Sequence, residues 1–74
     1  MPSSQTQTVQ IVVNGDPTSV AAGLNLVELL GVLGVDPHRV AIELNRAIVR
    51  QPDWLSTTVE QGAVIEVVQF VGGG

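Results

Sequence analysis

One helical segment, residues 25–34, constrains the fold more than any other part of this sequence. Asn25 is a suitable N-cap, and Glu28 can bond back to the backbone of the cap to complete a capping box. Gly34 is placed for a C-cap, and Pro37 lies shortly beyond it. Four leucines recur at the spacing of one helix face: Leu26, Leu29, Leu30 and Leu33. A stripe of this kind must be buried, so the rest of the chain has to provide an apolar surface against it.

The segments on either side of this helix alternate with the two-residue period of β-strands. The predicted strands cover residues 8–13, 18–22, 40–44, 47–50 and 64–71. Asn14 and Gly15 indicate a tight hairpin turn, because both residues tolerate positive φ. Pro52 excludes a central strand and favours a single helical turn, in which Trp54 would close the open end of the core. Residues 57–61 are predicted to form a polar loop.

This order of elements predicts an α+β fold, a mixed sheet of four to five strands with one main helix packed on one face. The first and last strands would pair in parallel, which is the β-grasp (ubiquitin-like) arrangement and leaves the C-terminus free at a sheet end. The predicted organisation is a disordered N-terminal segment at residues 1–7, one domain at residues 8–70 and a flexible tail at residues 71–74 that ends in two glycines.

Composition narrows the possible functions of this 74-residue chain. It has no cysteine, so disulfides and thiolate chemistry are excluded, and a hydrophobic content of 45% has to form the core. Seven acidic residues oppose three arginines and no lysine, giving a formal net charge of −4. Such a chain is a poor binder of nucleic acid or of an anionic membrane. No membrane-length apolar run and no leader pattern is present, so the expected compartment is the cytoplasm.

The three glycines at the end of the chain form its most distinctive chemical feature. Gly72, Gly73 and Gly74 have no Cβ to obstruct a narrow slot or attack at a carbonyl carbon. At ~3.3–3.6 Å per residue, the four residues from Val71 could carry a terminal carboxylate roughly 13–14 Å beyond the domain. The tail therefore suits threading into another protein, and a frayed end is the alternative explanation.

The last predicted strand carries a second indication of a partner. Its two faces are Ile65, Val67 and Gln69 on one side, and Val64, Glu66, Val68 and Phe70 on the other. A single helix covers only one face of a sheet, so apolar residues on the other face need a different explanation. We expect Val68, Phe70 and Val71 to dock a partner protein. Packing of these side chains on loops or on the N-terminal segment is the alternative.

With these features the chain resembles the ThiS-type ubiquitin-like sulfur carrier proteins of thiamine biosynthesis, over residues 9–74. The similar stretches are Val27-Glu28-Leu29-Leu30, Val40-Ala41-Ile42-Glu43-Leu44-Asn45, Ile48-Val49-Arg50 with Trp54, Gly62 with Ile65-Glu66-Val67-Val68, and Phe70-Val71-Gly72-Gly73-Gly74. Only Gly73-Gly74 is diagnostic of function, and the other positions mainly determine the fold. Pro52 and Ala63 depart from the family pattern, in which a proline precedes the arginine and an aspartate follows the glycine.

The resemblance implies that Gly74 is the sulfur-carrying residue and that Gly72 and Gly73 thread into the partner. A ThiF-type adenylating enzyme would use MgATP to convert the Gly74 carboxylate into an acyl-adenylate. A sulfur donor protein or sulfide would then displace AMP and leave a thiocarboxylate, which would donate sulfur for thiazole formation by a ThiG-type thiazole synthase. The chain would thus be a protein co-substrate, not an enzyme, and would bind no cofactor or metal itself.

The residue types agree with a chain that performs no catalysis. The sequence lacks a nucleophile–base pair, and its glycine-rich run is not followed by a helix that could hold a phosphate. His38 is predicted to be a surface loop residue and Glu28 a helix cap. Glu43 and Glu66 are predicted to be solvated strand residues and not an acid–base pair.

Four other functions remain open at this level. The chain could be a molybdopterin-synthase small-subunit-like carrier, or a carrier for another pathway such as cysteine synthesis. It could instead be a non-carrier β-grasp interaction module whose glycines are a loose end. A ubiquitin-style protein modifier is a further possibility, because an activated terminus can also reach a lysine amine.

Overall fold

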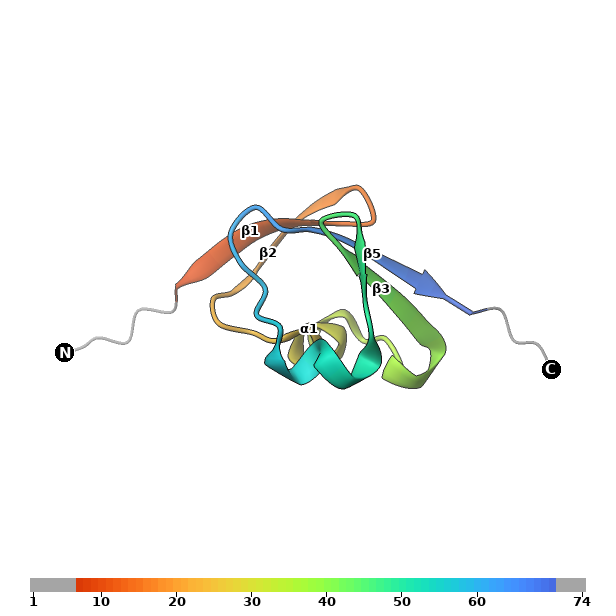
Figure 1. The fold of residues 1–74 in the computed structure, drawn as a ribbon. Helices are drawn as coiled ribbons and strands as arrows, with labels where there is room; N and C mark the ends of the chain where they lie inside the picture. The colour runs from red at the N-terminus through yellow and green to blue at the C-terminus, as the bar shows by residue number, and fades with distance from the viewer. Residues whose placement is uncertain (1–6, 71–74) are drawn as a thin grey trace.

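A computed structural model describes residues 7–70 and shows a sheet that arches over a helical layer (Figure 1). The elements are β1 (Thr8–Val13), β2 (Asp16–Ala21), α1 (Leu26–Leu33), η1 (Pro37–Arg39), β3 (Val40–Leu44), β4 (Ala47–Val49), η2 (Gln51–Ser56) and β5 (Val64–Gln69), where η1 and η2 are 3-10 turns. The predicted two-layer α+β arrangement is confirmed. The N-terminal segment predicted to be disordered, apart from residue 7, and the predicted tail lie outside the described residues.

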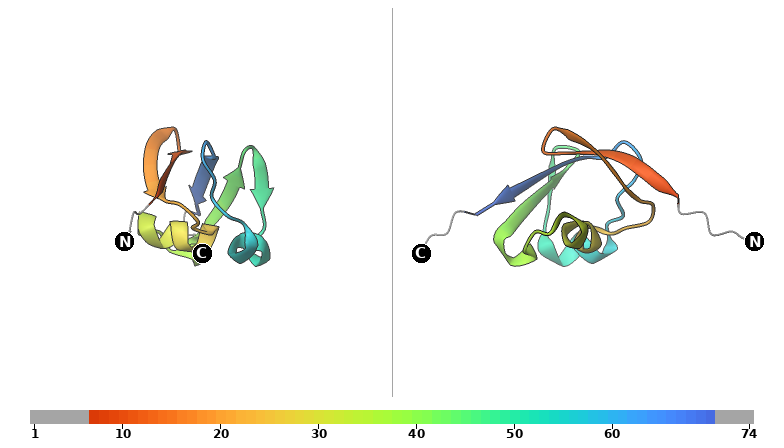
Figure 2. Two further views of the ribbon diagram at one scale, coloured as in Figure 1. Left: turned by 90° about the vertical axis from the view of Figure 1, so that its left-hand side faces the viewer. Right: turned by 180° about the vertical axis from the view of Figure 1, so that it is seen from behind.

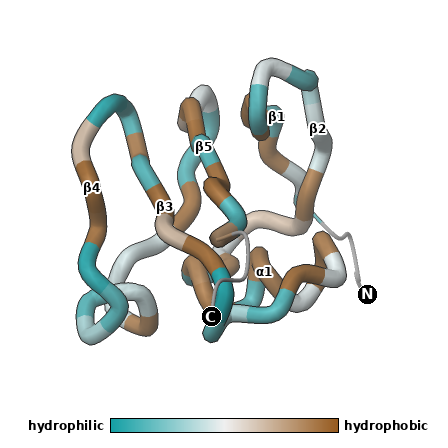
Figure 3. Tube along the Cα trace, turned by 90° about the vertical axis from the view of Figure 1, so that its right-hand side faces the viewer, coloured by the Kyte–Doolittle hydropathy of each residue, from teal (hydrophilic) through white to brown (hydrophobic). Residues whose placement is uncertain are grey.

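The five strands form one mixed sheet in the order β2-β1-β5-β3-β4, with β5 in the centre. Figure 3 shows this row of strands from one end, with α1 on one side of it. β1 and β5 pair in parallel as predicted, but only Val12 and Val13 are aligned with Val64 and Ile65. The other strand pairs are antiparallel. β5 therefore extends past the end of β1, and its second half has only β3 as a neighbouring strand.

The predicted hairpin between β1 and β2 is confirmed, with a shorter connection than expected. Asn14 and Gly15 have φ values of 50° and 84°, as a two-residue turn requires. Such a turn places Asp16 directly opposite Val13, so β2 begins at residue 16 and not at residue 18. Pro17 is tolerated within β2 because this strand lies at the edge of the sheet.

The helix caps predicted from the sequence are present. The Asn25 side chain accepts a hydrogen bond from the Glu28 N–H at 2.8 Å, and Glu28 Oε1 accepts one from the Asn25 N–H at 2.9 Å. Gly34 ends the helix in the left-handed conformation, with φ 74°. Its N–H donates to the Gly31 carbonyl at 3.2 Å. These caps fix where α1 begins and ends, and the apolar stripe determines which residues face the core, namely Leu26, Leu29 and Leu30.

The core lies between the inner face of the sheet and a layer made of α1 and η2 (Figure 2). Its fully buried large side chains are Ile11, Leu26, Leu29, Leu30, Ile42, Val59 and Ile65. Trp54, predicted to close one end of the core, is buried within it, and its Nε1–H donates to the Val49 carbonyl at 2.8 Å. The prediction of a polar loop at residues 57–61 is wrong at Val59, which is part of the core. The Val59 N–H donates to the Leu24 carbonyl at 2.7 Å, which holds this loop against the start of the helix.

Three strand ends also differ from the predictions, and β2 ends at Ala21, one residue before its predicted end. β4 ends at Val49, because Arg50 already serves as the N-terminal cap of η2. β5 is assigned to Val64–Gln69, whereas the predicted strand extended to Val71. Val71 lies outside the described residues, so the comparison ends at Phe70.

Candidate functional site

The described part of the candidate site is the end of β5 and the outer face of the sheet. Val71, Gly72, Gly73 and Gly74, to which the predicted docking, threading and sulfur-carrying roles belong, lie outside the described residues. Phe70 is the last described residue before them. The structure therefore describes the strand end that precedes the predicted tail, at Gln69 and Phe70.

β3 pairs with one edge of β5 along its length. The antiparallel register aligns residues 65–69 of β5 with residues 40–44 of β3. The ladder continues one residue further, because the Phe70 N–H donates to the Arg39 carbonyl at 2.7 Å. At the other end of β5, the Asn45 N–H donates to the Val64 carbonyl at 2.7 Å. The chain is thus fixed to β3 up to the residue next to the predicted tail.

A side chain replaces the missing backbone partner on the other side of β5. The Val67 N–H donates to Asn14 Oδ1 at 2.7 Å, and Asn14 Nδ2 donates to the Val67 carbonyl at 3.3 Å. The Asn14 amide thus continues the β1 side of the ladder after the chain has turned into β2. Sequence reasoning identified Asn14 only as a turn residue, since the turn gives no sign of which strand its side chain would reach.

Burial confirms the predicted alternation of β5 from Val64 to Val68, whereas Gln69, predicted on the inner face, is exposed at the end of the strand. Ile65 is fully buried and Val67 is half-buried, whereas Val64, Val68 and Phe70 are 43%, 52% and 56% exposed. Phe70 and Val68, the two described residues of the predicted docking set, therefore lie on the outer side and are not covered by any loop within residues 7–70. Ile48 of β4, which the sequence analysis did not select, is 72% exposed.

The other titratable residues considered from the sequence occupy the elements expected of them, and two of them prove to be paired across strands. His38 is exposed in η1, and its backbone N–H donates to Asp36 Oδ1 at 2.9 Å. Glu28 is the helix cap described above. Glu43 and Glu66 are strand residues as predicted, but the register places them directly opposite each other. The sequence patterns of two separated strands could not reveal that pairing.

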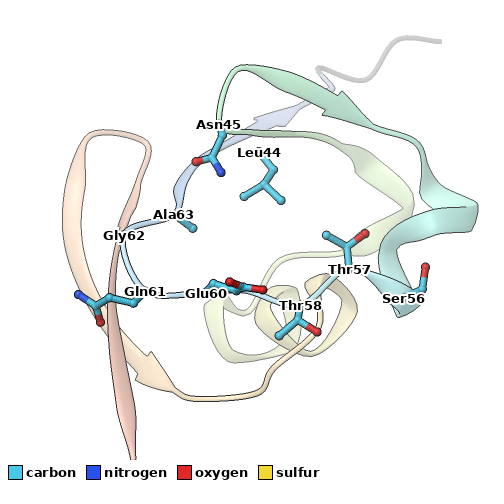
Figure 4. A pocket seen from close by; sticks show the side chains of 9 residues that line it. All are labelled: Leu44, Asn45, Ser56, Thr57, Thr58, Glu60, Gln61, Gly62 and Ala63. Atoms are coloured by element: carbon cyan, nitrogen blue, oxygen red, sulfur yellow. The ribbon is translucent and has the colours of Figure 1, made fainter.

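Two cavities lie at opposite ends of β5. The larger, of about 530 Å³, is at its beginning and is open and polar (Figure 4). Its lining is Leu44, Asn45, Ser56, Thr57, Thr58, Glu60, Gln61, Gly62 and Ala63. It contains one carboxylate and no basic side chain, so it lacks the charge to hold a phosphate. The smaller, of about 210 Å³, is mainly apolar and lies beside Val67 and Gln69.

Neither metal binding nor membrane spanning is indicated within residues 7–70. This part of the chain has no group of three or more histidine, cysteine, aspartate or glutamate side chains that could hold a metal ion. None of its helices is both long enough and apolar enough to cross a bilayer. The described residues provide a strand end that is hydrogen-bonded to β3 and an exposed apolar surface beside it.

Comparison with known proteins gives consistent matches over nearly the whole chain. The ThiS family model matches residues 5–74. The crystal structure of a thiamine biosynthesis protein (ThiS) from Geobacter metallireducens is similar, with a TM-score of 0.79 and 38% identity over 89% of this chain and 100% of that one. This similarity confirms the predicted β-grasp fold.

Two curated relatives are considerably longer. Thiazole synthases from Paramagnetospirillum magneticum and Magnetococcus marinus are 38% and 39% identical over 66 residues, which is 89% of this chain. The chain spans only 20% of the length of each of these proteins. In both relatives, a region similar to this chain is therefore part of a larger polypeptide.

Proposed function

This chain belongs to the ThiS family, and we propose on that basis that it is a sulfur carrier protein of thiamine biosynthesis. In this proposal the Gly74 carboxylate is adenylated and converted to a thiocarboxylate, which donates its sulfur for thiazole formation. The chain acts as a co-substrate and supplies a terminus and docking surfaces, while the partners supply the catalytic groups and the MgATP. The match of the family model through residue 74 is the observation that carries the proposal.

The chemistry explains why a carrier needs an activating partner. A carboxylate is a poor electrophile, so its oxygen must first attack the α-phosphorus of ATP, releasing pyrophosphate and forming an acyl-adenylate. Sulfide then adds to the acyl carbon and AMP leaves, so that one carboxylate oxygen is replaced by sulfur. Glycine at the acyl position leaves the carbonyl carbon unobstructed on both faces.

The geometry of β5 supports this role. The strand is bonded to β3 up to Phe70, so the last described residue before the predicted tail is held at a defined position on the sheet. Val68 and Phe70 present an apolar surface beside that point. We propose that this surface docks the partner, and that Val71, Gly72 and Gly73 enter its active site with Gly74 at the reacting position.

The relatives support thiazole synthase as the acceptor of the sulfur. Two proteins named thiazole synthase contain a region 38–39% identical to this chain. Joining two polypeptides raises the effective concentration of one for the other, which is useful when they act together. The ThiF-type adenylating enzyme is proposed from the family resemblance and from the need to activate a carboxylate, and the cytoplasm is the proposed compartment of the reaction.

The decisive experiment is an intact-mass measurement after incubation with a ThiF-type adenylating enzyme, MgATP and sulfide. We expect one oxygen to be replaced by sulfur, with the change localised to Gly74 by fragmentation. A variant that lacks Gly74 should fold normally and remain unmodified. No mass change with an enzyme that is active on its own carrier, or modification of the variant without Gly74, would contradict the proposal.

A further inference from the structure

Two glutamates lie side by side on the outer face of the sheet. Glu43 of β3 is directly opposite Glu66 of β5, and Cα atoms at such positions are separated by about 4.5–5.5 Å. Their neighbours Ile42 and Ile65 are fully buried in the core. Because successive strand residues point to opposite faces, both carboxylates project from the uncovered face. Glu66 is exposed and Glu43 is half-buried.

No basic side chain within residues 7–70 forms a salt bridge with either glutamate. The one ion pair in that part of the chain joins Arg39 Nε to Asp36 Oδ2 at 3.8 Å, and it does not involve either glutamate. Like charges directly opposite each other in a sheet are destabilising. The pairing of Glu43 with Glu66 therefore contributes nothing favourable to the folded chain by itself.

Apolar side chains surround the two carboxylates. Ile48 of β4 is directly opposite Glu43, on the side away from Glu66. Val64 lies two positions before Glu66 and Val68 two positions after it, so all three share one face of β5. All three apolar residues are among the large hydrophobic side chains that remain exposed. β4, β3 and β5 lie in a row (Figure 3), so these residues form one surface with a paired negative charge inside it.

A second copy of this chain is an unsuitable occupant for this surface. A two-fold symmetric contact centred here would bring the glutamates of both copies together. The three arginines lie at strand ends, Arg39 before β3 and Arg46 and Arg50 on either side of β4, and none lies within a strand beside the glutamates. A contact centred on the pair therefore favours a different molecule with apolar side chains and a positive charge.

We propose that the outer face of β3, β4 and β5 docks a partner protein that inserts an arginine between Glu43 and Glu66, with apolar side chains around it. Arginine fits because its planar guanidinium has five donors and can bond two carboxylates at once. The identity of the partner rests on the proposed function: it is the adenylating enzyme that receives the tail. Phe70 lies on the same face, next to residue 71, so docking here and entry of the tail occur on one side of the molecule.

The test compares Glu43→Gln, Glu66→Gln and the double variant with the unchanged chain. Glutamine keeps the size of the side chain and removes its charge. Glu60→Gln is the matched control, because Glu60 is also exposed but lies in the loop before β5. The dissociation constant for the adenylating enzyme is measured by calorimetry at several salt concentrations, and thermal unfolding is measured for each variant.

We expect the double variant to bind about tenfold more weakly, because a charge-assisted interfacial pair is lost. Its affinity should also depend less steeply on salt than that of the unchanged chain. Its thermal midpoint should be unchanged or slightly higher, since a like-charge contact is removed. Equal affinity and equal salt dependence for the double variant and the Glu60→Gln control would overturn the inference.

The outcomes separate this inference from the proposed function. If the unchanged chain forms a thiocarboxylate and the double variant does so with the same concentration dependence, only the docking inference fails. If the unchanged chain binds the enzyme through the glutamates but gains no sulfur, the docking inference stands and the carrier function fails. Self-association that is abolished by the double variant would identify a second copy as the occupant and overturn the proposed partner.

Discussion

The two faces of the sheet are built from adjacent residues of the same strands, but the inner face is buried and apolar and the outer face is exposed and partly charged. On the inner face, Ile42 and Ile65 are fully buried against the helical layer. On the outer face, one position along in the same strands, Glu43 and Glu66 form a like-charged pair and Val68 remains exposed. The buried side chains of the inner face stabilise the folded chain, whereas the opposed glutamates and exposed valine of the outer face add no favourable contact to it. We infer that the inner face supplies stability and the outer face supplies recognition.

The largest expected effect comes from truncating the inner face. Ile65→Ala should lower the free energy of unfolding by about 2–5 kcal/mol, because it removes buried methyl groups and leaves a cavity. Since small domains have a total stability of about 5–15 kcal/mol, this is a large fraction of it. Chemical denaturation measures the loss, and Val68→Ala in the same strand is the control. Similar losses for both variants would show that the two faces do not differ as described.

The next effect tests how the end of β5 is held. Asn14→Gly tolerates the positive φ but removes both hydrogen bonds to Val67, so we expect a loss of about 1–2 kcal/mol. Amide hydrogen exchange should become faster at Val67. Asn45→Gly is the matched control, since Asn45 also has positive φ and accepts a bond from the Val64 N–H at the other end of β5. Faster exchange at Val67 in the control, and not in Asn14→Gly, would contradict the assigned contact.

A smaller effect is expected at the helix cap. Asn25→Ala removes the side-chain oxygen that accepts the Glu28 N–H and should cost about 1 kcal/mol. Thermal unfolding measures this loss. Partner affinity at a temperature where the variant is folded should equal that of the unchanged chain, because α1 lies on the inner side. A clear loss of affinity there would mean that recognition is not confined to the outer face.

The smallest effect on stability is expected from the outer face. The double variant Val68→Ser and Phe70→Ser should change the free energy of unfolding by no more than about 0.5 kcal/mol for each substitution. Binding to the adenylating enzyme should nevertheless weaken, because the apolar docking surface is lost. Denaturation and calorimetry on the same preparation give both quantities. Unchanged binding would remove Val68 and Phe70 from the proposed interface.

Features fixed by short-range interactions were predictable from the sequence. The capping box of Asn25 and Glu28, the hairpin turn and the alternation of β5 depend on residues close together in the chain, and all three are confirmed. Val59 was missed because one valine between polar neighbours shows no period, although contact with the start of the helix buries it.

Features that depend on the pairing of distant strands were not predictable. The opposition of Glu43 and Glu66 follows from the register of β3 with β5. A short strand, a 3-10 turn and a loop separate these two strands, so no tight turn fixes their alignment. The contact of Asn14 with Val67 joins residues 53 positions apart. The roles of Gly72, Gly73 and Gly74 stay predictions.

The short parallel overlap of β1 and β5 determines how the domain would carry a mechanical load. A pull on the chain beyond Phe70 acts along β5, whose bonds to β3 run across the pulling direction from residue 64 to residue 70. These bonds are loaded together in shear and are not peeled apart one after another. The tension passes into β3 along the whole of β5, while the β1 side shares it at Val12 and Val13 and through the backbone N–H and side chain of Asn14. A partner that draws in the end of this chain therefore pulls mainly against the β3 ladder, and the hairpin of β1 and β2 carries the smaller share of the load.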